Sequence, residues 1–284
     1  MATFTNQATL TYAGNVTTSN VVTGELQQTV SITKYAVTET YTTDEVLTYV
    51  ISLVNSGSTA LTDLTVTDNL GAYTLEGNNL VPLDYVEGSL TYYLGGARQA
   101  TPVITDTSPL TVTGITVPAG GNAFLVYQAR VNEYASPATG GTITNTATVT
   151  GDGLPAPITA VETVQAAGEP FLTVGKTLSP TTVSEGDRLT YTFVIQNFGN
   201  TPIVATDDAV ITDTFDPVLS DLSVTFNGAS WSEGAEYTYD ETTGLFATVA
   251  GNILVPAATY TRNPDTGAWT VIPGVSTLVV VGTV

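Results

Sequence analysis

The sequence predicts an all-β protein with two β-sandwich domains in tandem and a short N-terminal arm. Thr and Val dominate the segments between turns, and their branched side chains suit a pleated, half-buried surface. The 26 glycines and 14 prolines divide these segments into short strands, and no stretch has the period of a helix. A length of 284 residues is enough for two domains of ordinary size, each with its own core.

An internal repeat defines the two domains. KYAVTETYTTDEVLTYVISLVNSG, residues 34–57, aligns without gaps on KTLSPTTVSEGDRLTYTFVIQNFG, residues 176–199. Downstream, LTDLTVTDNL and ATDDAVITDTF align so that Asp68 matches Asp213. Short alternating strands with frequent turn residues are typical of an immunoglobulin-like sandwich. We therefore predict domain 1 over residues 31–165 and domain 2 over residues 170–284.

The two copies differ in their closing strand. Copy one ends with ITNTATVT at residues 143–150, whereas copy two reaches Val284, which aligns with Val131, without a similar segment. A matching motif, FTNQATLTY, stands at residues 4–12 instead. We therefore expect residues 1–30 to be an arm that consists of a donor strand, about residues 4–12, followed by a linker.

The donor strand has an apolar face with one amide on it, because side chains alternate along a strand. This face carries Phe4, Asn6, Ala8, Leu10 and Tyr12. An incomplete sandwich exposes apolar surface and unpaired backbone groups, so a strand must cover it. If the arm folds back within its own chain, the protein is a monomeric surface module for adhesion or ligand binding. If it inserts into a neighbour, each subunit gives and receives a strand, and a head-to-tail filament results. The short linker between the copies favours the filament.

Composition excludes several functional classes. A net charge of −20 with six basic residues argues against nucleic acid or an anionic membrane as a partner. The absence of Cys and His excludes disulfides, Cys/His zinc sites, cysteine nucleophiles and histidine-based triads. We therefore expect no enzyme, no cofactor and no metal site. MATFTNQATL lacks the basic flank and apolar core of a signal peptide, and no membrane-spanning segment follows.

Six polar residues fall on apolar strand faces. The lysines share their faces with Val30 and Ile32 in copy one and with Leu172 and Val174 in copy two. A buried, unpaired ammonium group is prohibitively costly, so these polar residues must meet one another. The set consists of Lys34, Asp68 and Asn145 in copy one, Lys176 and Asp213 in copy two, and Asn6 in the arm.

These motifs resemble a known family. The lysine with its LTYV or LTYT strand, the VTD strand and the closing TNTATVT strand are similar to the conserved repeat called domain of unknown function 11. The resemblance covers residues 31–150 and 170–284, and it implies immunoglobulin-like modules of bacterial surface proteins. A chain with two such copies also resembles spore appendage subunits. That likeness implies an extracellular or spore-surface filament of identical subunits that meets a host or cell surface. Assembly inside a mother cell and release by lysis would need no signal peptide.

The resemblance further implies an isopeptide bond between Lys and Asn that an acidic residue assists. In domain 1 the set is Lys34, Asn145 and Asp68; in domain 2 it is Lys176, Asp213 and Asn6 of a neighbouring subunit. Burial lowers the pKa of a lysine and raises that of a carboxylic acid, which favours attack by a neutral amine. The residues leave open a buried salt bridge with a hydrogen-bonded Asn, and they leave Asp63 and Asp208 as alternative acids.

Overall fold

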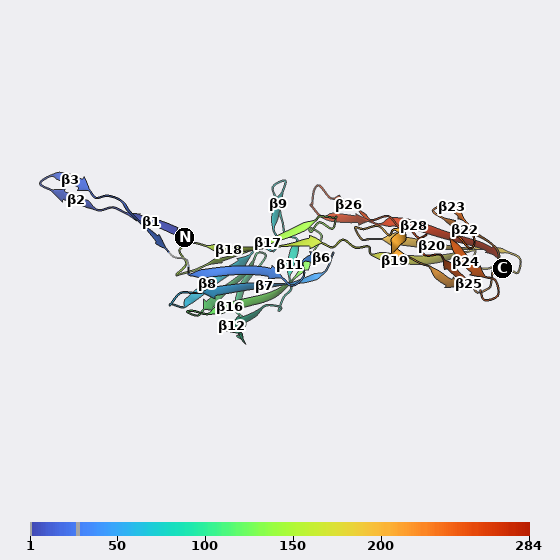
Figure 1. Cartoon of the computed structure of the whole chain (residues 1–284), viewed down its shortest axis with the longest axis horizontal. Helices are drawn as coiled ribbons and strands as arrows, with labels where there is room; N and C mark the ends of the chain where they lie inside the picture. The colour runs from blue at the N-terminus through green and yellow to red at the C-terminus, as the bar shows by residue number, and fades with distance from the viewer. Residues whose placement is uncertain (1, 27–28) are drawn as a thin grey trace. The chain divides into compact units, whose positions relative to one another are not determined.

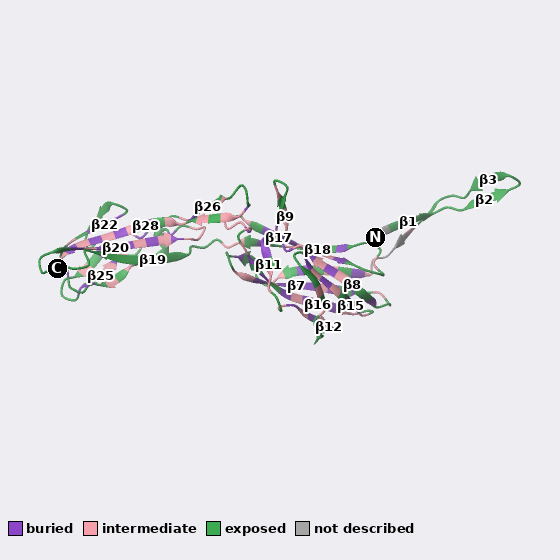
Figure 2. Cartoon of the chain, turned by 180° about the vertical axis from the view of Figure 1, so that it is seen from behind, coloured by how far each residue is buried: buried purple, intermediate pink, exposed green. Residues whose placement is uncertain are grey.

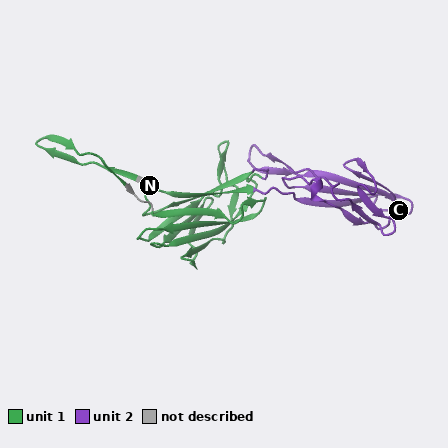
Figure 3. Ribbon diagram, viewed as in Figure 1, with its two compact units in different colours: residues 1–136, 141–165 green, residues 137–140, 166–284 purple. Residues whose placement is uncertain are grey.

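The computed structural model describes residues 2–26 and 29–284 and is built almost entirely of strands (Figure 1). Two compact units share the chain: residues 1–136 with 141–165, and residues 137–140 with 166–284 (Figure 3). Each contains an immunoglobulin-like β-sandwich, which we call domain 1 and domain 2. A single 3₁₀ turn, η1 (Ala205–Asp207), is the only helical element in the described chain.

Domain 1 consists of two antiparallel sheets whose inner faces form its core. The first has the order β13 (Ala97–Arg98), β12 (Thr91–Leu94), β16 (Asn122–Val131), β7 (Val46–Asn55) and β5 (Val30–Ala36), with β11 (Leu83–Tyr85) also paired to β16. The second has the order β14 (Val103–Thr107), β15 (Leu110–Val117), β8 (Leu61–Asp68), β17 (Thr142–Thr150), β18 (Ile158–Ala166) and β6 (Thr40–Tyr41). A separate hairpin joins β9 (Tyr73–Leu75) and β10 (Asn78–Leu80).

Domain 2 repeats this architecture with fewer strands. Its first sheet has the order β23 (Ala229–Trp231), β22 (Ser220–Phe226), β28 (Gly274–Thr283), β20 (Arg188–Asn197) and β19 (Leu172–Ser179). Its second sheet contains only β21 (Thr212–Thr214), β25 (Leu245–Thr248) and β24 (Tyr237–Asp240), and a hairpin joins β26 (Thr259–Arg262) and β27 (Trp269–Ile272). Aromatic side chains fill the core, where Phe215 stacks on Tyr191 with 4.7 Å between ring centroids.

The internal repeat extends to individual hydrogen bonds. Asn55 ends β7 and Asn197 ends β20, and both are buried. The amide Nδ2 of Asn55 donates to the carbonyl oxygen of Thr59 at 2.8 Å, and that of Asn197 donates to Thr201 at 2.7 Å. Their side-chain oxygens accept from Gly57 and Gly199, each at 2.9 Å. The two copies can therefore be compared strand by strand.

The arm forms a hairpin rather than a strand followed by a linker. β1 (Ala2–Asn6) pairs with β4 (Val22–Leu26), and β2 (Thr9–Tyr12) pairs with β3 (Asn15–Thr18). Residues 15–18 and 22–26, which we expected within the linker, therefore form the return strand. We call residues 2–26 the arm hairpin.

Candidate functional site

Three strands of domain 1 bring Lys34, Asp68 and Asn145 together between the two sheets. Lys34 lies on β5, Asp68 ends β8 and Asn145 lies on β17; all three are buried. The Nζ atom of Lys34 donates to Oδ2 of Asp68 at 2.5 Å. The strand alternation that set these polar residues on apolar faces therefore places them in the core.

Tyr127 connects the lysine–aspartate pair to the amide. Its hydroxyl donates to Oδ2 of Asp68 at 2.7 Å, and it accepts from Nδ2 of Asn145 at 3.1 Å. Sequence reasoning missed this residue, because a tyrosine on the apolar face of a strand resembles ordinary core packing. Its partner across the sheet is Tyr49, whose ring stacks on that of Tyr127 and also lies under the Lys34 ammonium, 4.9 Å from the ring centroid.

Gly71 supplies a backbone donor to the amide oxygen. Its N–H donates to Oδ1 of Asn145 at 3.2 Å, which polarises the side-chain carbonyl group. The backbone of Gly71 has φ of +74°, and an added Cβ would lie 2.6 Å from Cγ2 of Ile143. Only glycine fits here without strain. Asn145 thus meets a donor at its oxygen, and an acceptor at its nitrogen.

Burial sets the protonation of the cluster. It lowers the pKa of Lys34 to about 8, although the Asp68 carboxylate acts in the opposite direction. Burial also raises the pKa of Tyr127, and the negative charge of Asp68 adds to the rise. Loss of the lysine proton near neutral pH is therefore far easier than in water, and Tyr127 stays a hydrogen-bond donor.

The two alternative acids lie outside the clusters. Asp63 lies within β8 and Asp208 directly follows η1; both are exposed, with φ of +54° and +51°. Asp68 and Asp213 contact the lysines instead. Of the candidate acids, Asp68 and Asp213 are therefore the two that lie beside the lysines.

Domain 2 contains the counterpart of this cluster in a more open form. Lys176 on β19 forms an ion pair with Asp213 on β21, and its Nζ lies 4.5 Å from the ring centroid of Tyr191. The Lys176 side chain is 40% exposed, whereas that of Lys34 is 0% exposed. Val280 stands opposite Tyr191, where domain 1 has Tyr127 opposite Tyr49, so the connecting hydroxyl is absent at this position. The third expected residue, Asn6, lies in the arm hairpin.

The second sheet of domain 2 has a free edge where domain 1 has its closing strand. In domain 1, β8 pairs with β15 on one side and with β17 on the other, so that Asp68 faces Ala147. In domain 2, β21 pairs with β25 on one side, and no other strand of the described residues pairs with it. Counterparts of β17 and β18 are therefore missing from this sheet.

Burial shows the consequence for the neighbouring edge strand. The inner face of β5 in domain 1 includes the buried residues Val30 and Lys34. All residues of the corresponding strand β19 are exposed, with Val174 at 62%. β19 therefore presents an apolar face, which also includes Leu172 and Leu178, that nothing in the described chain covers.

The arm hairpin exposes a strand motif whose copy in domain 1 is buried. Val149 of β17 is fully buried, whereas Leu10 at the equivalent place of the repeated motif is 61% exposed. Strands β2 and β3 are exposed throughout, and Figure 2 shows them in green. The motif that is buried in the core of domain 1 is thus exposed in the arm. In domain 2, the apolar surface that such a motif would cover is also exposed.

Neither a metal site nor a membrane helix occurs in the part of the chain that the structure describes. No group of three acidic side chains among these residues is placed to hold an ion. No helix of the same residues has the length and apolar character needed to cross a membrane.

Comparisons with known proteins find similarity in structure only. No family model and no curated protein matches the sequence. The pilus backbone RrgB from Streptococcus pneumoniae is 11% identical over 86% of this chain and 55% of its own, with a TM-score of 0.34. BcpA, the major pilin subunit of Bacillus cereus, is 14% identical over 95% and 73%, with a TM-score of 0.34. The collagen-binding domain from a Staphylococcus aureus adhesin is 11% identical over 49% and 99%, with a TM-score of 0.32. At identities this low, roles of individual residues do not transfer to this chain.

Proposed function

We propose that the protein is a structural, non-enzymatic subunit of an extracellular or spore-surface filament. Subunits join head to tail when the arm of one completes domain 2 of the next. One observation carries this proposal: domain 2 has counterparts of domain 1's main sheet strands but not of β17 and β18, and the arm repeats the β17 motif. Because the giving and receiving surfaces differ, the contact is heterologous and need not close into a ring.

The pairing of domain 1 gives the register of the inserted strand. Ala147 stands opposite Asp68 there, so Ala8 of the arm belongs opposite Asp213. Asn6 then faces the Lys176–Asp213 pair, as Asn145 faces the Lys34–Asp68 pair. Insertion buries Leu10 where domain 1 buries Val149, and it pairs the free edge of β21.

In domain 1, the cluster supports closure of a bond between Lys34 and Asn145. One proton moves from Nζ of Lys34 to Oδ2 of Asp68 along their 2.5 Å contact, which produces a neutral amine and a neutral acid. Nζ attacks Cγ of Asn145, while the N–H of Gly71 stabilises the charge that develops on Oδ1. The bond from Cγ to Nδ2 breaks, the amine proton passes to the leaving nitrogen, and ammonia departs. The product is an amide between the two side chains, and Asp68 is restored as a carboxylate once a proton has left the site.

The domain 2 cluster supports the same reaction between subunits. Lys176 and Asp213 form an ion pair before assembly, and insertion of the neighbour's arm adds Asn6 to this pair. Insertion of the arm excludes water from Lys176 and brings the Asn6 amide to the ion pair. This order of events confines the bond to assembled filaments and leaves free subunits unlinked.

The rate of bond closure in domain 1 should be constant near neutral pH and should fall about tenfold per unit above about pH 8. The reactive form, with neutral Lys34 and protonated Asp68, holds the same number of protons as the ion pair. Above about pH 8 it is depleted because the pair loses its last proton. Chains refolded from inclusion bodies are quenched at intervals, and intact mass follows the loss of ammonia. Both proteins carry Asn6→Ala, which prevents the bond between subunits, so the added substitution Asn145→Ala is the control that loses no ammonia at any pH. A rate that rises up to about pH 8 would instead show that solvent, and not Asp68, removes the lysine proton.

Boiling the native assembly in detergent tests the proposal. The wild type should give a ladder of covalent multimers, and Asn6→Ala should give monomers on the gel while electron micrographs still show filaments. This separation is expected because pairing of the inserted strand needs no side-chain bond. Asn6→Ala filaments that still give a ladder would refute the role of Asn6. Wild-type protein that remains a monomer, with its arm docked on its own chain, would refute the filament and favour the monomeric adhesion module.

A further inference from the structure

We propose that the donated element is the whole arm hairpin, residues 2–26, and not a single strand. Its return strand, β3 and β4, then occupies in the neighbour's domain 2 the place that β18 occupies in domain 1. This inference rests on the proposed function, because it specifies how the arm completes domain 2.

The arm is already a paired unit with its own turn. Tyr12 and Asn15 flank Ala13 and Gly14, which have φ of +44° and +82°, as a tight turn between twisted strands requires. Ser19 fixes the irregular step in the return strand: its Oγ accepts from the N–H of Ala8 at 2.9 Å. Insertion as a single strand would have to break all of this pairing.

The arm hairpin copies the hairpin that closes domain 1. β17 pairs antiparallel with β18 in the second sheet, and Asn145 stands opposite Glu162. In the arm, the equivalent Asn6 stands opposite Val22. In both the arm and domain 1, the repeated motif that contains the asparagine is thus the first strand of a hairpin.

The cross-strand pairs also match in volume. In domain 1, Ile143 stands opposite Val164, and both are buried. The equivalent pair of the arm is Phe4 and Gly24, and the Phe4 ring lies so close over Gly24 that an added Cβ would sit 2.4 Å from it. A large and a small residue thus replace two of medium size, which suits a core of similar volume.

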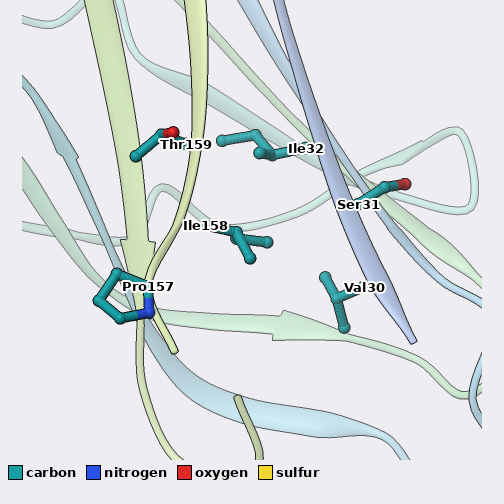
Figure 4. A pocket seen from close by; sticks show the side chains of 6 residues that line it. All are labelled: Val30, Ser31, Ile32, Pro157, Ile158 and Thr159. Carbon is teal, nitrogen blue, oxygen red and sulfur yellow. The ribbon is translucent and has the colours of Figure 1, made fainter. Parts of the chain in front are cut away.

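The surface that would receive the return strand is identified by domain 1. There, the edge strand β5 and strand β18 flank a groove in which Val30 and Ile32 lie across from Ile158 (Figure 4). Glu162 of β18 lies near enough to Lys34 to influence its pKa. In domain 2 the strand equivalent to β5 is β19, whose exposed face needs a cover of the β18 kind. A single donated strand would leave that side of Lys176 open.

Charge also suits docking on a second copy of this chain. The whole protein has a net charge of −20, yet residues 2–24 contain no Asp, Glu, Lys or Arg. With Glu25 as its one charged side chain, the hairpin approaches an acidic neighbour with little repulsion between like charges. An isolated two-stranded hairpin is marginally stable in water, so docking also stabilises the arm itself.

A disulfide lock across the hairpin distinguishes the two modes of insertion. Thr11 and Val16 are cross-strand partners on the face opposite Asn6, and the chain has no other cysteine. The variant Thr11→Cys/Val16→Cys, oxidised as a monomer, should assemble at a rate within about twofold of the reduced form, because the docked hairpin keeps this pair. Thr11→Cys alone is the matched control for loss of the threonine.

The outcomes separate this inference from the proposed function. Reduced protein that forms filaments while oxidised protein does not would overturn hairpin donation and keep insertion of a single strand. Wild-type protein that forms no filaments would overturn both. As a second readout, Gly-Ser repeats of equal length in place of residues 15–26 should lower the assembly rate at least about tenfold; an unchanged rate would contradict a role for the return strand.

Discussion

Subunits that lack residues 2–12 are expected to stay monomeric at concentrations at which the wild type forms filaments. The deletion removes Phe4, Leu10 and Tyr12, which are at least half exposed in the arm and would be buried on insertion. Burial of the half of each side chain that is still exposed contributes about 0.7–1.5 kcal/mol, so the loss of all three weakens association by about thirtyfold to a thousandfold. Electron microscopy and sedimentation of the two proteins at equal concentration give the comparison.

Two neighbouring substitutions provide the matched control for this deletion. Leu10→Asn places an amide on the face that we expect to be buried, and it should weaken association about tenfold to a hundredfold. Thr11→Asn changes the adjacent outward position and should alter association by no more than about twofold. Equal effects of the two substitutions, or filaments from the deleted chain, would contradict insertion of this face.

Replacement of Asp68 should destabilise domain 1 more than any other single change of a charged residue there. In an Asn145→Ala background, in which the bond cannot close, Asp68→Asn preserves the size of the side chain but leaves the Lys34 ammonium buried without a counter-ion. Breaking a buried pair in this way costs about 3–5 kcal/mol. Hydrogen exchange of the amides in β7 and β16 reports this loss for domain 1 alone.

The control for Asp68 is the exposed acid of the same strand. Asp63→Asn tolerates the same backbone conformation, with φ of +54°, and should change stability by less than about 0.5 kcal/mol. The double variant Lys34→Met/Asp68→Asn should recover at least half of the loss, because no buried charge remains. A cost of less than about 1 kcal/mol for Asp68→Asn would mean that the pair contributes little to the core.

Much of the fold follows from the sequence, because period and repetition are strong signals. Strand alternation has a period of two, so a polar residue on an apolar face must be buried with a partner. This reasoning correctly predicted that Lys34, Asp68 and Asn145 are buried together, and that Lys176 meets Asp213. The all-β class and the two immunoglobulin-like sandwiches also followed from the alternation and from the internal repeat.

The return strand of the arm was missed for two physical reasons. The turn is Ala-Gly, and alanine rarely takes the positive φ of its position, so the dipeptide is a weaker hairpin signal than Asn-Gly or Asp-Gly. Residues 19–21 separate β3, which pairs with β2, from β4, which pairs with β1, and the register of pairing shifts by one residue between them. The second strand therefore lacks the regular apolar face that identifies the first.

Other parts of the site depend on contacts that a sequence does not display. Gly71 lies in a turn, and its donor role follows from a backbone direction rather than a side chain. The exposure of Lys176 is a property of the sheet edge: β19 has the same pattern as β5 but lacks the strands that cover β5. The alternation of a strand predicts which residues lie on the same face. Whether that face is buried depends on the strands that pack against it.

The position of the arm in the neighbouring subunit is the central claim, and a cysteine cross-link measures it directly. Because Thr148 stands opposite Thr67 in domain 1, Thr9 of the arm belongs opposite Thr212 of the next subunit. Oxidised filaments of Thr9→Cys/Thr212→Cys that also carry Asn6→Ala should give a ladder on a non-reducing gel, and reducing agent should collapse it to monomers. The variant Thr9→Cys/Thr214→Cys, shifted by two residues on the same face, should give much less of the ladder. An equal ladder from both variants, or a disulfide that forms only within single chains, would contradict this account.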